Sequence, residues 1–148
     1  MLGPHPATAQ PSTQDTLDVQ ASIIAYHEGF STGNVARAPA ALSDALYMFN
    51  GNFSGEPTNW QAHQYLSGDA LRNWPALMIK QTGPFTNQYE FVQASIRGGA
   101  ALVVTRETGQ NQFRNWSDEV VTWMLGRGEG GWQIVGLFIR DVSNPGSE

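Results

Sequence analysis

The fold is decided by residues 89–139, which read YEFVQASIRGGAALVVTRETGQNQFRNWSDEVVTWMLGRGEGGWQIVGLFI. Apolar segments rich in β-branched and aromatic residues alternate there with short connections that contain glycine or asparagine. Segments of this kind predict strands, and connections of this kind predict the turns of hairpins. The sequence therefore predicts an antiparallel meander of strands at residues 89–96, 100–107, 116–125 and 132–139.

Helical patterns precede these strands. Val19, Ile23, Tyr26 and Phe30 recur at helical spacing, so that they share one face of a helix expected over residues 15–32. Helices followed by a run of strands predict an α+β fold, with the helices on one face of a curved sheet. Between the first helix and the meander we expect, in order, a helix at 35–42, a strand at 46–49 and helical pieces at 60–66 and 68–80.

Composition limits the classes of function that remain. A chain of 148 residues has the length of one domain. Its net charge of −5 argues against nucleic-acid binding, and its lack of cysteine excludes disulfides and thiolate chemistry. No stretch approaches the ~20 apolar residues of a membrane span. Three scattered histidines without HxH or HxxxH spacing predict no metal site, and we expect no cofactor.

The two ends of the chain differ from its middle. Residues 1–14 hold three prolines and no apolar periodicity, so we expect a disordered leader there. After the leader we expect a single domain over residues 15–144 and a short tail over 145–148. Ala7-Thr8-Ala9 has the small-x-small form of a signal-peptidase site, which is one of two open interpretations and would make the protein exported and periplasmic. The charged and apolar regions that should precede such a site are absent, and a cytoplasmic location is the alternative.

Three motifs together resemble a known family. They are the helix end YHEGFSTGNV at residues 26–35, the acidic corner LSDALY at 42–47 and the strand start GGWQIV at 130–135. In this order and at these spacings they are similar to the nuclear-transport-factor-2-like (NTF2-like) superfamily, in its SnoaL-like branch. Asn34 stands where the family has an aspartate, and Gln133 stands where it has a basic residue.

The resemblance implies a cone-shaped α+β barrel, in which a curved antiparallel sheet wraps around the N-terminal helices and leaves an apolar pocket. It also implies a homodimer packed through the convex face of the sheet and a small apolar molecule as ligand. The family includes isomerases, cyclases, dehydratases and hydrolases as well as non-catalytic proteins. A non-catalytic ligand-binding or dimerisation module is therefore the alternative to a small-molecule enzyme.

The catalytic residues of two well-known branches are not matched. Tyr26 falls at the position of the helix tyrosine of ketosteroid isomerases, but their general base falls on Asn50 or Phe49, and neither can abstract a proton. Limonene-type epoxide hydrolases need an arginine where this chain has Glu107. An aspartate at the end of their last strand corresponds to Asp141 only with a one-residue slip. Whether the protein is an enzyme is left open by the sequence.

The chain's own polar residues give the remaining candidates. Strand alternation predicts that Thr105 and Glu107 point into the cone, as do Phe138 and Arg140. Glu107 and Arg140 would then meet near the pocket mouth, either as a structural ion pair or as a base beside an anion-binding arginine. His27 is the third catalytic candidate, unless it is simply hydrogen-bonded at the helix edge. The expected pocket residues are Tyr26, Trp74, Thr105, Trp132 and Phe138, and Asp118 is a further acid to consider.

Overall fold

A computed structural model describes residues 13–34, 36–52, 57–59, 61–110 and 115–141. Most of the predicted leader and the whole of the predicted tail at 145–148 lie outside these ranges. The elements are α1 (Thr13–Thr32), α2 (Arg37–Ala40), β1 (Leu42–Asn52), the 3-10 turn η1 (Pro57–Asn59), β2 (Gln61–Ser67), α3 (Gly68–Thr82), β3 (Asn87–Arg97), β4 (Ala100–Gln110), β5 (Asn115–Gly128) and β6 (Gly131–Asp141).

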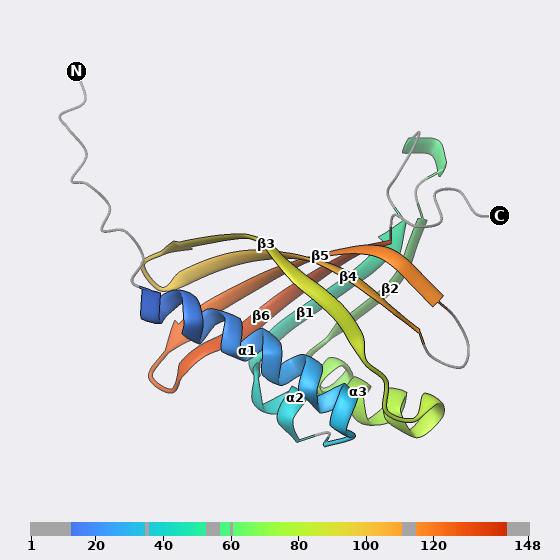
Figure 1. Cartoon of the computed structure of the whole chain (residues 1–148), viewed down its shortest axis with the longest axis horizontal. Coiled ribbons are helices and arrows are strands. Elements are labelled where there is room, and N and C mark those ends of the chain that lie inside the picture. The colour runs from blue at the N-terminus through green and yellow to red at the C-terminus, as the bar shows by residue number, and fades with distance from the viewer. Residues whose placement is uncertain (1–12, 35, 53–56, 60, 111–114, 142–148) are drawn as a thin grey trace.

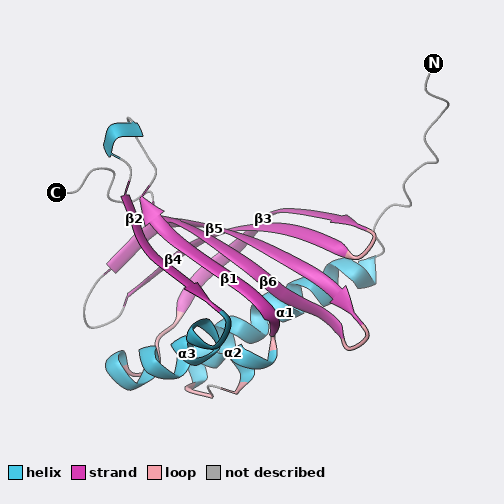
Figure 2. Ribbon diagram, turned by 180° about the vertical axis from the view of Figure 1, so that it is seen from behind, coloured by secondary structure: helices cyan, strands magenta, loops and turns pink. Residues whose placement is uncertain are grey.

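The strands form one curved sheet in the order β2-β1-β6-β5-β4-β3, and the helices lie together on its concave side (Figure 1). The predicted meander is confirmed, because β3, β4, β5 and β6 pair antiparallel in sequence order. The predicted α+β class is confirmed too. The sheet is mixed, since β1 runs parallel to β6, and it does not close into a barrel (Figure 2).

The region between α1 and the meander differs from its sequence pattern. Residues 60–66, predicted to be helical, contain the larger part of strand β2, which pairs with β1 from Tyr47↔Ser67 to Asn52↔Gln61. α2 is shorter than the predicted helix at 35–42, because β1 begins at Leu42. The Ile134 amide donates a hydrogen bond to the Ala41 carbonyl at 2.8 Å, which ties this corner to β6. Pairing with distant strands overrides the local preference in both places.

The core lies between α1 and the concave face of the sheet. On α1, Val19, Ile23, Tyr26 and Phe30 are buried, as the helical spacing predicted. Removing each such side chain from water stabilises the fold by roughly 1.5–3 kcal/mol. The sheet contributes Val103, Val121, Trp123, Leu125, Ile134 and Leu137 to the same cluster.

Among the described residues no helix is long and apolar enough to cross a membrane.

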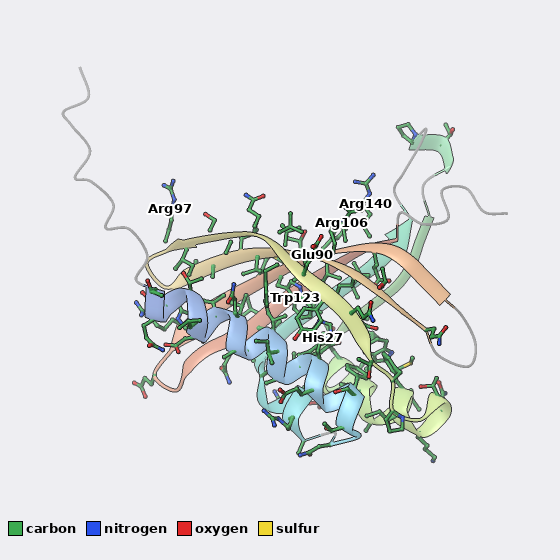
Figure 3. The ribbon with its side chains drawn as sticks, in the orientation of Figure 1. His27, Glu90, Arg97, Arg106, Trp123 and Arg140 are labelled. Carbon is green, nitrogen blue, oxygen red and sulfur yellow. The ribbon has the colours of Figure 1, made fainter. Side chains whose placement is uncertain are left out.

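A β-bulge in β6 changes which residues face the core. The β5–β6 ladder passes over Val135, so that Ile134 is buried before the bulge and Leu137 after it. Alternation therefore shifts by one residue, and the prediction that Phe138 and Arg140 point into the cone is wrong. Arg140 is exposed and extends from the convex side of the sheet, away from α1 (Figure 3).

Candidate functional site

A chain of hydrogen bonds surrounds Glu107, which is buried on the concave face of β4 with 2% of its surface exposed. Thr105 Oγ1 donates to Glu107 Oε2 at 2.6 Å, and Asn87 Nδ2 donates to Glu107 Oε1 at 3.1 Å. Trp123 Nε1 donates to Thr105 Oγ1 at 2.9 Å. Since the threonine hydroxyl accepts from the indole, its own proton is directed at the carboxylate. Both oxygens of Glu107 therefore act as acceptors, as those of an ionised carboxylate do.

Strand geometry brings these groups together. Thr105 and Glu107 are two residues apart on β4, so they share the concave face. The β3–β4 register places Tyr89 opposite Glu107 and Asn87 opposite Gly109, which puts both β3 side chains beside the carboxylate. A buried carboxylate without such partners would cost several kcal/mol, and the hydrogen bonds offset that cost.

His27 reaches Glu107 from α1. Its Nε2 lies 3.3 Å from Glu107 Oε2, and its side chain is 8% exposed. The distance suits an ion pair, but the imidazole is not oriented to hydrogen-bond the carboxylate, and Nε2 has no hydrogen-bond partner among the described residues. Tyr89 stacks on the imidazole at 4.2 Å, and Trp123 meets it edge-on at 5.5 Å. The ring is thus held in place with one buried nitrogen that makes no hydrogen bond with the described residues.

Two tyrosines next to the carboxylate stay neutral. Burial raises the pKa of Tyr26 far above its ordinary value, and the negative charges of Glu107 and Glu119 raise it further. The pKa of the half-buried Tyr89 is also raised, first by burial and then by the charge of Glu107. Both phenols therefore keep their protons at physiological pH and can act as hydrogen-bond donors.

Glu119 is a second buried carboxylate that the sequence analysis missed. It is 7% exposed and stands directly opposite Glu107 in the β4–β5 register. The side chain of Asp118, the acid that the sequence suggests in this segment, lies outside those described. Extending the buried alternation of Val121 and Trp123 back by two residues would have found Glu119. Asn87 was missed because the predicted strand began two residues after it.

The structure brings together some of the predicted site residues and separates others. Tyr26, His27, Thr105 and Glu107 form one cluster. Arg140 does not reach Glu107, because the two side chains lie on opposite faces of the sheet. Among the described residues no group of His, Asp and Glu side chains is placed to hold a metal ion.

The other three predicted pocket residues lie away from this cluster. Trp74, on α3, packs against Phe30 at 5.8 Å. Phe138 is partly buried on the convex side of the bulged strand. Trp132 pairs with Arg127 near the β5–β6 turn, at the opposite end of the ladder from Glu119. It is covered there by the Arg127 guanidinium, 5.3 Å from the ring centroid.

Comparison with solved structures identifies the fold. A proposed dehydratase of the NTF2-like family from Streptomyces avermitilis superposes with a TM-score of 0.72 at 15% identity, over 88% of this chain and 99% of that one. A ketosteroid isomerase-like protein from Erwinia carotovora atroseptica gives a TM-score of 0.67 at 18% identity, over 89% of this chain and 99% of that one. The chain has the NTF2-like fold, as its motifs predicted.

Sequence comparison is less informative. No protein-family model matches the chain. The hybrid PKS-NRPS synthetase thnA of Trichoderma harzianum is 36% identical over 78 residues. That segment is 53% of this chain but 2% of the synthetase. The similarity thus concerns a small piece of a much larger protein.

Replacing the central hydroxyl tests the hydrogen-bond chain. Thr105→Val keeps the shape of the side chain but removes the hydrogen bonds that Glu107 Oε2 and Trp123 Nε1 make with the hydroxyl. We expect the free energy of unfolding in urea to fall by about 2 kcal/mol, because buried groups lose their hydrogen bonds. Thr108→Val, on the exposed face of the same strand, is the matched control and should change stability little. Equal effects of the two substitutions would contradict the network.

Alkaline pH tests the burial of Tyr26. Because its pKa is higher in the folded protein than the ordinary value near 10, the stability it contributes is complete below pH 10 and is lost as the pH rises above it. We expect the free energy of unfolding to fall by up to about 1.4 kcal/mol per pH unit above pH 10. Tyr26→Phe should make this slope shallower. An identical slope in the wild type and in Tyr26→Phe would show that Tyr26 ionises freely.

Proposed function

We propose that this NTF2-like chain binds a small, largely apolar organic molecule between α1 and the concave face of the sheet, beside Glu107 and His27. The observation that carries this proposal is His27 Nε2, a buried polar atom without a hydrogen-bond partner among the described residues, 3.3 Å from a buried carboxylate. Buried polar atoms are nearly always paired, so an unpaired one points to a missing ligand or water. The SnoaL-like assignment of the motifs belongs to the same proposal.

The same pair can move a proton. An imidazole nitrogen that accepts a proton from a bound C–H or O–H group becomes positively charged, and the adjacent Glu107 carboxylate stabilises that charge. Returning the proton at another position of the ligand completes an isomerisation, and returning it to a leaving hydroxyl completes a dehydration. Tyr26, as a neutral phenol, can donate a hydrogen bond to a ligand oxygen. This supports an isomerase, cyclase, dehydratase or hydrolase as the class of enzyme.

The alternative is a non-catalytic ligand-binding protein. Glu107 is hydrogen-bonded at both oxygens to its own strand neighbours, so it could be a structural group that shapes a binding site. The enzyme and the non-catalytic protein differ in whether the bound ligand loses a proton.

Phenylacetone is a suitable probe, since it joins an apolar ring to a carbonyl group and an acidic CH2. Binding would be followed by the NMR chemical shifts of the His27 ring, and proton transfer by the loss of the CH2 signal in D2O. We expect saturable shifts, with exchange faster than in buffer for the wild type. Glu107→Gln and His27→Asn should abolish the faster exchange, whereas Glu90→Gln, at an exposed acid of β3, should retain it.

Each result of this experiment supports or excludes one of the proposed functions. Faster exchange that both site variants abolish establishes the enzyme. Saturable shifts without faster exchange establish the non-catalytic alternative. No shift of the His27 ring at millimolar phenylacetone would contradict the binding site itself.

We further propose that the protein is a homodimer joined through the convex face of the sheet. Leu102, Met124 and Tyr47 are large apolar side chains that are 40%, 42% and 57% exposed. The register aligns Leu102 with Met124, and both Met124 and Tyr47 with Gly136, so the three form one row across four strands. A Cβ added at Gly136 would lie 2.6 Å from Met124 Cε, so the glycine leaves room for the methionine. Such a continuous exposed apolar row favours a protein interface.

Sedimentation of the purified protein tests the dimer. We expect the wild type to sediment at twice the mass of the chain at micromolar concentration. Met124→Lys places a charge in the apolar row and should weaken the dimer by about tenfold or more. Leu77→Lys, at an exposed leucine of α3, is the control and should leave the mass unchanged. A monomeric wild type would contradict the proposal.

A further inference from the structure

The concave face carries two carboxylates in direct opposition. Glu107 and Glu119 are register partners on β4 and β5, and both are buried. Side chains directly opposite each other in an antiparallel pair lie about 5 Å apart at their Cβ atoms, and like charges in that position destabilise a sheet. The raised pKa of Tyr26 supports the same geometry, since the charges of both carboxylates act on that one phenol.

The described part of the chain offers little positive charge to neutralise the carboxylates of Glu107 and Glu119. Among the buried residues that the structure describes, His27 is the one side chain that can become a cation. Arg97, Arg106 and Arg140 extend from the convex side of the sheet, away from α1 (Figure 3). The β6 bulge thus removes the arginine that would have suited an anionic ligand. The chain as a whole also carries a net charge of −5, which attracts cations rather than anions.

Aromatic rings surround the same place. The imidazole of His27 lies between the Tyr89 ring, stacked at 4.2 Å, and the Trp123 ring, edge-on at 5.5 Å. Tyr26 meets Trp123 edge-on at 5.3 Å. Aromatic rings attract organic ammonium groups through their negatively polarised faces, and nearby carboxylates strengthen that attraction. A metal ion is a poorer fit, because no described group of His, Asp and Glu side chains is placed to hold one.

We infer that the ligand of this site is an organic cation, with an ammonium group held at the Glu107–Glu119 pair and an apolar body packed against the surrounding rings. This inference rests on the proposed binding site and names the charge class of its ligand. His27 Nε2, which lies 3.3 Å from Glu107 Oε2 but makes no hydrogen bond with the described residues, is a buried polar atom that points to a ligand here. Glu119 is also engaged with a neighbouring group, so the cation is expected to complement that contact rather than replace it.

Three probes of nearly equal size test the charge preference: 2-phenylethylammonium, 2-phenylethanol and phenylacetate. Their affinities would be measured at pH 7 by titration, with the His27 ring shifts as the readout of site. We expect the ammonium compound to bind about tenfold more tightly than the alcohol, because a charge-assisted hydrogen bond to a buried carboxylate is stronger than a neutral one. Phenylacetate should bind most weakly. An alcohol or phenylacetate that binds as tightly as the ammonium compound would overturn the inference.

Glu119→Gln removes one charge of the pair while preserving the size of the side chain. We expect it to weaken 2-phenylethylammonium by about tenfold and to leave 2-phenylethanol unchanged. Glu90→Gln removes an acid from an exposed position of β3 and should change neither affinity. Unchanged ammonium binding in Glu119→Gln would overturn the role of this residue. If that variant does not fold, the three probes on the wild-type protein still decide the inference.

The outcomes also separate this inference from the proposed function. Binding of phenylacetone and 2-phenylethanol at His27, with no advantage for the ammonium compound, would leave the proposed site intact and overturn the cation inference. Failure of all the probes to shift the His27 ring would overturn both.

Discussion

Packing α1 against the concave face of the sheet excludes water from whatever polar groups lie beneath the helix. The apolar residues Val19, Ile23 and Phe30 drive this packing, and burying them contributes several kcal/mol. The same packing buries Glu107, whose charge is then costly unless it is paired. Trp123, Thr105 and Asn87 supply the hydrogen bonds, so that a hydrophobic contact made elsewhere on the helix sets the polar organisation of the site.

The bulge at Val135 divides the chemistry of the protein between the two faces of the sheet. Without the extra residue, Arg140 would lie on the concave side, on the same face of the sheet as Glu107. Because the bulge is present, Leu137 and Ile139 point into the core, and Arg140 extends from the convex surface. The concave face keeps carboxylates and aromatic rings, whereas the convex face carries arginines and the row that contains Met124. The carboxylates and rings of the concave face suit a small ligand, and the exposed residues of the convex face suit a protein partner.

The fold is shared with a ketosteroid isomerase-like protein and a proposed dehydratase, but at 15–18% identity that similarity extends to the architecture alone. The function must therefore be argued from this chain's own side chains. Glu107 belongs to the meander, and His27 belongs to the helix packed over it.

Local patterns were enough for the parts of the structure that depend on neighbours in the chain. The spacing of Val19, Ile23 and Tyr26 identified α1 and its buried face, and the glycine-bearing connections identified the hairpins of the meander. Thr105 and Glu107 were placed on one face correctly, because β4 alternates without interruption in that segment. Each of these features is encoded within a few residues of where it appears.

Other features arise from contacts between distant segments, which no local pattern encodes. β2 is a strand because β1 offers it a partner, and β1 runs parallel to β6 across more than eighty residues of chain. The bulge depends on how β5 and β6 align, and one extra residue there reverses the direction of Arg140. Glu119 faces Glu107 through the register of β4 and β5, and His27 reaches both strands through the packing of α1. Residue types and periodicity thus specify the elements, and the alignment of strands and helix determines which charges meet.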